Sequence, residues 1–431
     1  MRRLASVLLW SVIAAAFIGP GTVATAASAG ASHGLALLWT LVFSTVACLV
    51  LQEASGRLTV VSGQTLGQAL RSRYSHGLQG GLVMLLVLGA ILLGCAAYEA
   101  GNILGGAAGA VLATGWPTRL LVLISGGVAA FLLWFQAPKT VARLLSVVVA
   151  VMGVAFLATA WRLGPALGDV VRGSLVPSLP RGSGVLALGL VGTTVVPYNL
   201  FLGSGLARGQ RLGDLRLGLA VAVGLGGAIS MGVLVVGTAV DGAFSFESLA
   251  TVLAQSLGGW ASTFFAVGLL GAGLSSAITA PLAAAITARD LMSRGDDDDR
   301  WGVRSWRYRG VWLAVLVTGL AFGISDVRPI PAIVLAQALN GLLLPMVAFF
   351  LLVAVNDKKL MAERTNGSIV NVLMGLVVLV SLLLGIVAIW RAAARVIGSP
   401  PPAPFEILLA TGVVALLLAV PATRALRSGG R

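Results

Sequence analysis

Charged side chains are scarce in this chain of 431 residues: Asp, Glu, Lys and Arg make up 10% of it, whereas hydrophobic residues make up 58%. Soluble domains carry about 25% charged residues, and the mean hydropathy here is +0.99. The composition therefore excludes a soluble fold. Only two cysteines and two histidines occur, which excludes a disulfide-rich domain and a Cys/His zinc motif. Because no nucleophile with a base or metal cluster is visible either, we expect no enzyme and no cofactor.

Long apolar runs are what the sequence has instead. A helix needs about 20 residues to cross a membrane, and the hydropathy pattern predicts an all-α polytopic membrane protein with about twelve transmembrane helices in a single domain over residues 1–431. The predicted spans are 7–29, 36–56, 78–106, 119–136, 140–161, 184–206, 215–240, 260–288, 311–324, 331–354, 369–390 and 405–422.

The positive charge is distributed unevenly between the predicted loops. Lys and Arg exceed Asp and Glu by 29 to 15, an excess that in a soluble protein would suggest nucleic acid as a partner. Here 22 of the 29 fall on the face that carries both termini and 7 on the other. The positive-inside rule then predicts a multi-pass protein of the cell membrane with both termini cytoplasmic, and the lipid bilayer rather than nucleic acid as partner. A cleavable signal peptide ending near Ala26 or Ala29 is the alternative.

Two of the predicted spans contain a proline break near their middle. The first contains Gly19-Pro20-Gly21-Thr22 and the sixth contains Thr193-Thr194-Val195-Val196-Pro197-Tyr198. Proline removes a backbone donor and clashes with the preceding turn, so each helix should unwind there. Helices interrupted at corresponding places in two halves indicate an inverted-repeat secondary transporter. We therefore expect the substrate site at these breaks, with repeats at about 7–161 and 184–354 and extra helices at about 369–422.

Four stretches carry a family resemblance. They are Arg57–Gly63 after the second span, Leu269–Thr279 in the eighth, Leu335–Asn340 in the tenth, and Asn356–Met361. With these motifs the chain resembles a divergent member of the NRAMP family of divalent-metal transporters. The resemblance implies the leucine-transporter-type fold, a 5+5 inverted repeat in which helices 1 and 6 are broken.

The metal-binding motifs of that family match in position but not in chemistry. In its metal-transporting members the first break reads Asp-Pro-Gly-Asn and the sixth helix carries Met-Pro-His. Here Gly19 replaces the Asp, Thr22 the Asn, Val196 the Met and Tyr198 the His. The carboxylate that offsets the charge of a desolvated divalent cation and the thioether that suits softer metals are both missing at these positions.

A neutral polar lining remains, and we predict that it binds the substrate. The predicted binding residues are Gly19, Pro20, Gly21, Thr22, Thr193, Thr194, Val196, Pro197, Tyr198, Gln337 and Asn340. Each polar member also has a structural interpretation, because Thr often bonds to its own helix and Asn or Gln often joins neighbouring helices. The resemblance favours Gln337, which occupies the place of a glutamine that approaches the ion in the family.

Glu99 is the acid that the sequence places well inside the hydrocarbon, whereas Asp290 is assigned to a cytoplasmic loop. An acid at that depth is a functional candidate, and the resemblance makes Glu99 a proton-pathway candidate. A neighbouring aspartate of the family is Ala96 here, and its sixth-helix histidine is Tyr198. Proton coupling of the usual kind is therefore in doubt.

Two transport functions follow from these residues. By resemblance, the first is secondary transport of a metal cation, such as Mg²⁺ or another hard cation that keeps most of its waters, at a carboxylate-free site. The second is transport of a small neutral or zwitterionic solute such as an amino acid, whose carboxylate would bind backbone N–H groups at the first break. A sensor or scaffold that does not transport is a third class. The oligomeric state is open.

Overall fold

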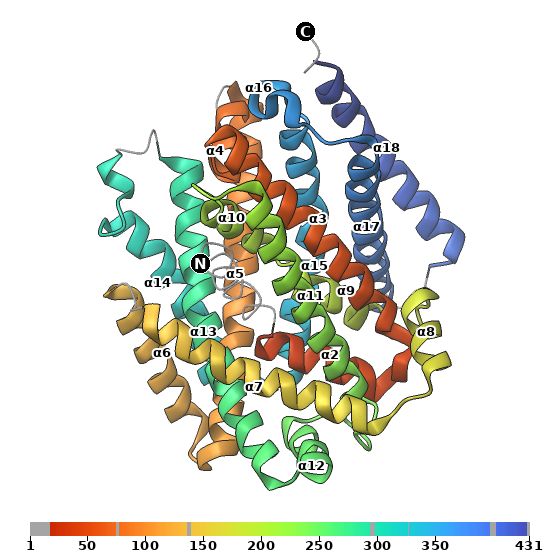
Figure 1. Cartoon of the computed structure of the whole chain (residues 1–431). Coiled ribbons are helices and arrows are strands. Elements are labelled where there is room, and N and C mark those ends of the chain that lie inside the picture. The colour runs from red at the N-terminus through yellow and green to blue at the C-terminus, as the bar shows by residue number, and fades with distance from the viewer. Residues whose placement is uncertain are drawn as a thin grey trace.

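The computed structural model describes residues 18–74, 77–135, 139–293, 298–325, 327–396 and 402–428. The long or span-forming helices are α2 (Pro20–His33), α3 (Leu38–Ser62), α5 (Gly77–Thr114), α6 (Thr118–Trp134), α7 (Lys139–Leu163), α9 (Gly184–Thr194), α10 (Pro197–Leu206), α11 (Leu212–Gly237), α13 (Gly259–Met292), α14 (Trp306–Ile324), α15 (Pro329–Val355), α17 (Ser368–Val396) and α18 (Pro404–Ser428). These helices run side by side in one bundle (Figure 1).

Within the described residues, the helices correspond to the last eleven predicted spans and to the second half of the first. Among the described residues, nine helical segments are long and apolar enough to cross a membrane, and the shorter apolar helices at 118–134 and 405–417 supply two more. The first of the nine, 20–62, combines α2 and α3, which are joined by a single 3₁₀ turn at Gly34–Leu37. The first half of the predicted span 7–29 lies outside the described residues, because these begin at Ile18.

The structure favours a spanning segment over a signal peptide for the first helix. Ala24, Ala26, Ala27 and Ala29 of α2 have no exposed surface and belong to the main hydrophobic core. Backbone of α11 lies directly on this face, since a Cβ added at Gly30 would lie 2.1 Å from the carbonyl oxygen of Leu234. Cleavage after Ala26 or Ala29 would therefore remove a buried part of the bundle.

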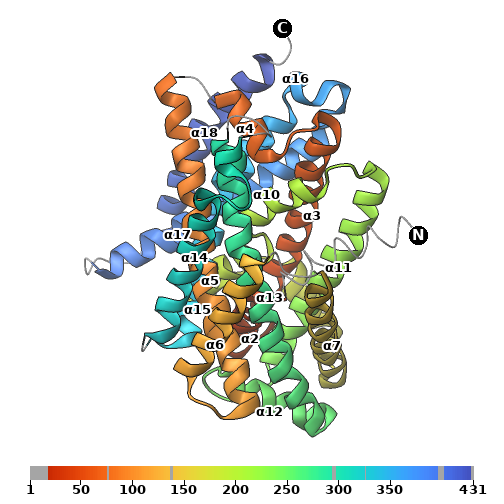
Figure 2. The same cartoon turned by 90° about the vertical axis from the view of Figure 1, so that its left-hand side faces the viewer.

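The structure also contains short helices that the hydropathy pattern does not predict. They are α4 (Leu66–Tyr74), α8 (Leu167–Leu175), α12 (Phe246–Leu257) and α16 (Lys358–Met361). In both views α4 and α16 lie at one end of the bundle and α12 at the opposite end (Figure 1 and Figure 2). Arg71, Arg73 and Lys358, all assigned to the cytoplasmic face, thus share one end.

Glycines let the central helices approach at backbone distance. A Cβ at Gly273 of α13 would lie 2.4 Å from the Cα of Gly106 of α5, and a Cβ at Gly192 of α9 would lie 2.0 Å from the carbonyl oxygen of Gln337 of α15. Small residues at helix interfaces are the usual means of close packing in membranes, because lipid supplies no hydrophobic drive for helices to associate. These contacts hold α5 against α13 and α9 against α15.

Candidate substrate site at the two helix breaks

Both predicted breaks have non-helical backbone in the structure. Gly19 has φ −77° and ψ 173°, and Pro20 is the first residue of α2. Between α9 and α10 the chain is extended at Val196, with φ −80° and ψ 120°, and Pro197 begins α10. Since proline has no N–H, the Thr193 carbonyl cannot form the bond to residue 197 that a continuous helix would make. The helical hydrogen-bonding pattern is therefore interrupted at the sixth span.

A pair of hydroxyl groups joins the two breaks. Thr22 Oγ1 of α2 and Thr193 Oγ1 of α9 lie 2.8 Å apart within hydrogen-bonding distance, although the residues are separated by 171 positions in the sequence. Both side chains are buried. The structure thus brings together one predicted polar residue from each half of the chain.

The Gln337 side chain covers the start of α2. A Cβ added at Gly21 would lie 2.2 Å from Gln337 Nε2, and a Cβ at Gly101 of α5 would lie 3.6 Å from the same atom. Gln337 is fully buried, and neither of its amide atoms has a hydrogen-bond partner among the described residues. Leaving a buried polar group unpaired costs about 1–3 kcal/mol, so this amide is suited to bind a substrate or its water.

An aromatic pair lies next to the break in the sixth span. The rings of Tyr198 at the start of α10 and Tyr98 of α5 meet edge to face, with centroids 5.5 Å apart and planes at 86°. Both rings are buried, and the Tyr98 side chain faces Thr193. The sequence analysis did not single out Tyr98. The signal that could have found it is its place next to Glu99, at the same depth in the third span.

The remaining predicted residues have structural roles in this conformation. Thr194 Oγ1 donates to the Leu190 carbonyl of its own helix at 3.0 Å. Asn340 Nδ2 donates to the Ala336 carbonyl at 3.1 Å and to the Gly94 carbonyl of α5 at 3.3 Å, so it joins α15 to α5. Thr194 therefore bonds to its own helix and Asn340 joins two helices, which is the structural alternative to substrate binding.

Apolar contacts position the rest of the two breaks. Pro20 packs on Gly105 of α5, where an added Cβ would lie 2.1 Å from Pro20 Cβ. Val196 is buried between α9 and α10. Asn199, in the first turn of α10, is also buried, and both of its amide atoms lack a hydrogen-bond partner among the described residues. It is a further polar residue that α10 positions near the break.

Glu99 lies on a different face of α5 from the tyrosine pair. Its side chain packs on α14, where a Cβ at Gly319 would lie 2.5 Å from Glu99 Cγ. The residue is fully buried, and Asn102 Nδ2 donates to its Oε2 at 3.4 Å. Successive residues of a helix point about 100° apart. The Glu99 carboxyl group therefore neighbours the site, because it follows Tyr98 in the chain, but it does not line the two breaks.

A cavity of about 1090 Å³ opens at the end of α10 that is predicted to be cytoplasmic. Its walls include Leu202 and Leu206 of α10, Arg208, and Asp290 of α13. The loop assignment of Asp290 is wrong: the residue lies in the last turns of α13, is 6% exposed, and accepts a hydrogen bond of 2.7 Å from Thr65 Oγ1. The helix extends beyond the apolar run because that hydrogen bond and Arg289 stabilise the buried carboxylate.

Oxygen atoms of hydroxyl, amide and backbone carbonyl groups are the ligands that this site can offer. Within the described part of the chain, no three His, Cys, Asp or Glu side chains gather at a distance suited to a metal ion. Cys48 and Cys95 are buried, free thiols. Neutral oxygen ligands suit hard cations that keep part of their hydration shell.

Comparison with known proteins identifies the family. The sequence model described as natural resistance-associated macrophage protein-like (Nramp) matches residues 11–391. The chain belongs to the Nramp family. This Nramp protein is 25% identical to the divalent metal cation transporter MntH of Yersinia enterocolitica, over 86% of this chain and 90% of that protein. It is 27% identical to MntH of Verminephrobacter eiseniae, over 84% and 83% of the two chains.

Solved structures with this fold are also transporters. The Eremococcus coleocola manganese transporter, in complex with an aromatic bis-isothiourea substituted compound, matches with a TM-score of 0.71 at 22% identity, over 99% of this Nramp chain and 94% of that chain. Mhp1, a nucleobase-cation-symport-1 family transporter, matches with a TM-score of 0.55 at 17% identity, over 97% and 92%. The predicted family and the predicted leucine-transporter-type, all-α fold are therefore confirmed.

Proposed function

We propose that this protein is a secondary transporter of a divalent cation and that its substrate binds between the two helix breaks. Membership of the Nramp family and the similarity to proteins named as divalent metal cation transporters support the cation. The observation that carries the placement is the Thr22–Thr193 hydroxyl pair, which joins the two breaks. Beside it lies the Gln337 amide, which has no hydrogen-bond partner in the described part of the chain. The excess of Lys and Arg on the face that carries both termini supports a cytoplasmic location for them.

The ligand chemistry favours a hard cation such as Mg²⁺. A carboxylate and a thioether are absent at Gly19 and Val196, so a soft ion gains little here and a fully dehydrated ion finds no negative charge at these positions. Hydroxyl and amide oxygens of Thr22, Thr193 and Gln337 can hold the waters of a hydrated ion. Glu99 is the proposed proton-pathway residue, since it is the buried carboxyl group next to Tyr98.

Manganese binding tests the ligand argument. We expect the purified protein to show no micromolar Mn²⁺ binding by calorimetry, and the double variant Gly19→Asp with Val196→Met to gain it, because it restores a carboxylate and a thioether at the two breaks. The control is Gly213→Asp, which adds the same charge at the start of α11, where an added Cβ meets open space. Micromolar binding by the unmodified protein would contradict the ligand argument. No gain of binding in the double variant would contradict the site placement.

Uptake into proteoliposomes tests the function itself. We expect accumulation of Mg²⁺ or another hard divalent cation, and we expect Glu99→Gln to reduce any dependence of uptake on a pH gradient. Uptake of amino acids without any metal uptake would overturn the proposal in favour of an organic solute.

A further inference from the structure

A second cavity lies outside the candidate substrate site, at the same end of the bundle as α4 and α16. It encloses about 540 Å³ between α3, α11, the start of α17 and the segment that precedes α17. Its lining includes Glu53 and Arg57 of α3, Arg216 and Leu219 of α11, Arg364, and Val370 of α17. Nothing in the proposed transport cycle uses this cavity.

The lining changes from apolar to charged along the axis of α3. Leu49 and Val50 are followed one turn later by Glu53 and two turns later by Arg57. With a rise of 1.5 Å per residue, this change takes place over about 12 Å along the axis of α3. Leu219 of α11 lies in the apolar part. The cavity therefore has the polarity of an amphiphile, with a charged end and an apolar end.

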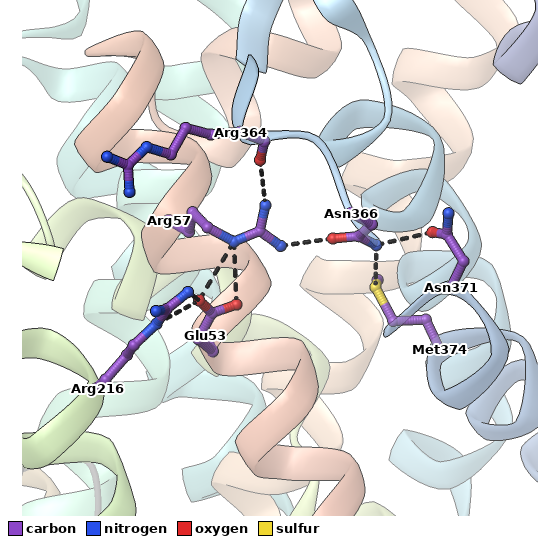
Figure 3. A network of polar contacts seen from close by, with 7 residues as sticks. All are labelled: Glu53, Arg57, Arg216, Arg364, Asn366, Asn371 and Met374. Carbon is purple, nitrogen blue, oxygen red and sulfur yellow. Dashed lines mark hydrogen bonds and ion pairs between the residues drawn. The ribbon is translucent and has the colours of Figure 1, made fainter. Parts of the chain in front are cut away.

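Hydrogen bonds and ion pairs connect the residues at the charged end of the cavity (Figure 3). The side chain of Arg57 is 6% exposed, and its Nε donates to Glu53 Oε2 at 3.1 Å. Its other guanidinium nitrogens donate to the Arg364 carbonyl and to Asn366 Oδ1. Asn366 in turn donates to Asn371 Oδ1 of α17 at 2.9 Å. This network fixes the segment 364–367 against α3.

Two further arginines of the lining reach solvent. The side chain of Arg216 is 57% exposed while its Nη2 lies 2.8 Å from Glu53 Oε1. Arg364 is exposed, and its guanidinium points away from the carbonyl that Arg57 binds (Figure 3). The lining holds three arginines against Glu53 and the exposed Glu363, so it carries a net positive charge and leaves two guanidinium groups accessible to an anion.

We propose that this cavity binds an anionic phospholipid of the cytoplasmic leaflet. The phosphate oxygens accept hydrogen bonds from Arg216 and Arg364, and an acyl chain lies along Leu49, Leu219 and Val370. Basic pockets between transmembrane helices on the cytoplasmic side suit anionic headgroups, because that leaflet has a negative surface potential. A free phosphate ion shares the headgroup chemistry but would leave the apolar part of the cavity uncovered.

Thermal unfolding of the full-length protein in detergent tests the proposal. Added phosphatidylglycerol should raise the melting temperature by about 2 °C or more, whereas phosphatidylcholine and inorganic phosphate should not. The double variant Arg216→Gln with Arg364→Gln should lose this shift. The matched control is Arg211→Gln, which removes an exposed arginine at the start of the same helix, outside the lining.

A variant that leaves every charge in place tests the apolar part. Val370→Trp fills the cavity and should abolish the phosphatidylglycerol shift without loss of the Arg57 network. An equal shift with inorganic phosphate would overturn the proposal in favour of a small-anion site. If Arg211→Gln lost the phosphatidylglycerol shift to the same extent as the double variant, general charge attraction would explain the shift and the proposal would be overturned. The absence of any shift in the unmodified protein would also overturn it.

Discussion

Two adjacent threonines have different roles at the residue scale. Thr193 Oγ1 reaches across to Thr22 of α2, whereas Thr194 Oγ1 bonds the Leu190 carbonyl of its own helix. Neighbouring residues of a helix point about 100° apart, so only one of the two hydroxyl groups can face α2. The sequence predicts both residues for the site and cannot separate them, because the rotation of α9 about its axis is set by packing.

This difference gives a matched pair of variants. Thr22→Val keeps the shape of the side chain and removes the hydroxyl pair, so we expect it to raise the KM for cation uptake by roughly fivefold or more, the equivalent of about 1 kcal/mol. Thr194→Val should leave the KM unchanged, because its hydroxyl serves its own helix. Equal effects of the two variants on proteoliposome uptake would contradict the placement of the substrate at the hydroxyl pair.

Among the helices, glycine allows α9 and α15 to pack with their backbones in contact. A Cβ at Gly192 of α9 would lie 2.0 Å from the Gln337 carbonyl oxygen and 2.3 Å from the amide nitrogen of Gly341, both backbone atoms of α15. Backbone cannot rotate away as a flexible side chain can, so the two helices would have to separate. The Gln337 side chain, which covers the start of α2, depends on this contact.

We therefore expect Gly192→Ala to destabilise the protein by about 3 kcal/mol, at the upper end for overpacked sites, and to lower the melting temperature in detergent. Gly224→Ala in α11 is the control, since an added Cβ there meets open space and alanine favours the helix by about 0.5–1 kcal/mol. A melting temperature of Gly192→Ala equal to that of the control would show that α9 and α15 are not in close contact.

The sequence predicted the interrupted sixth helix but missed α4, α8 and α12. Proline imposes its break through covalent structure, so Pro197 identifies the break without knowledge of the fold. Short helices of 9 to 12 residues such as α8 and α12 are marginal in isolation and depend on tertiary packing. They leave no long apolar run, which explains why hydropathy alone does not reveal them.

The orientation of the protein in the membrane is a property of the whole molecule, and cysteine labelling can test it. Both native cysteines, Cys48 and Cys95, are buried, so a membrane-impermeant maleimide should give little background labelling. We expect Arg172→Cys, on exposed α8, to be labelled in intact cells, and Lys358→Cys, exposed on α16, to be labelled only after lysis. The reverse pattern would invert the topology, and with it the leaflet assigned to the lipid cavity.

The sequence by itself determined the membrane class, the spans, the broken sixth helix and the charge asymmetry, because hydropathy, proline geometry and loop charge are local properties. The family resemblance adds the prediction that Gly19 and Val196 stand where metal-transporting members have their ligands. Tertiary structure alone decided which polar groups meet, such as Thr22 with Thr193 and Arg57 with Asn366, which lie 171 and 309 residues apart. Those pairs depend on the rotation of each helix and on glycine contacts between helices, which no single segment of sequence encodes.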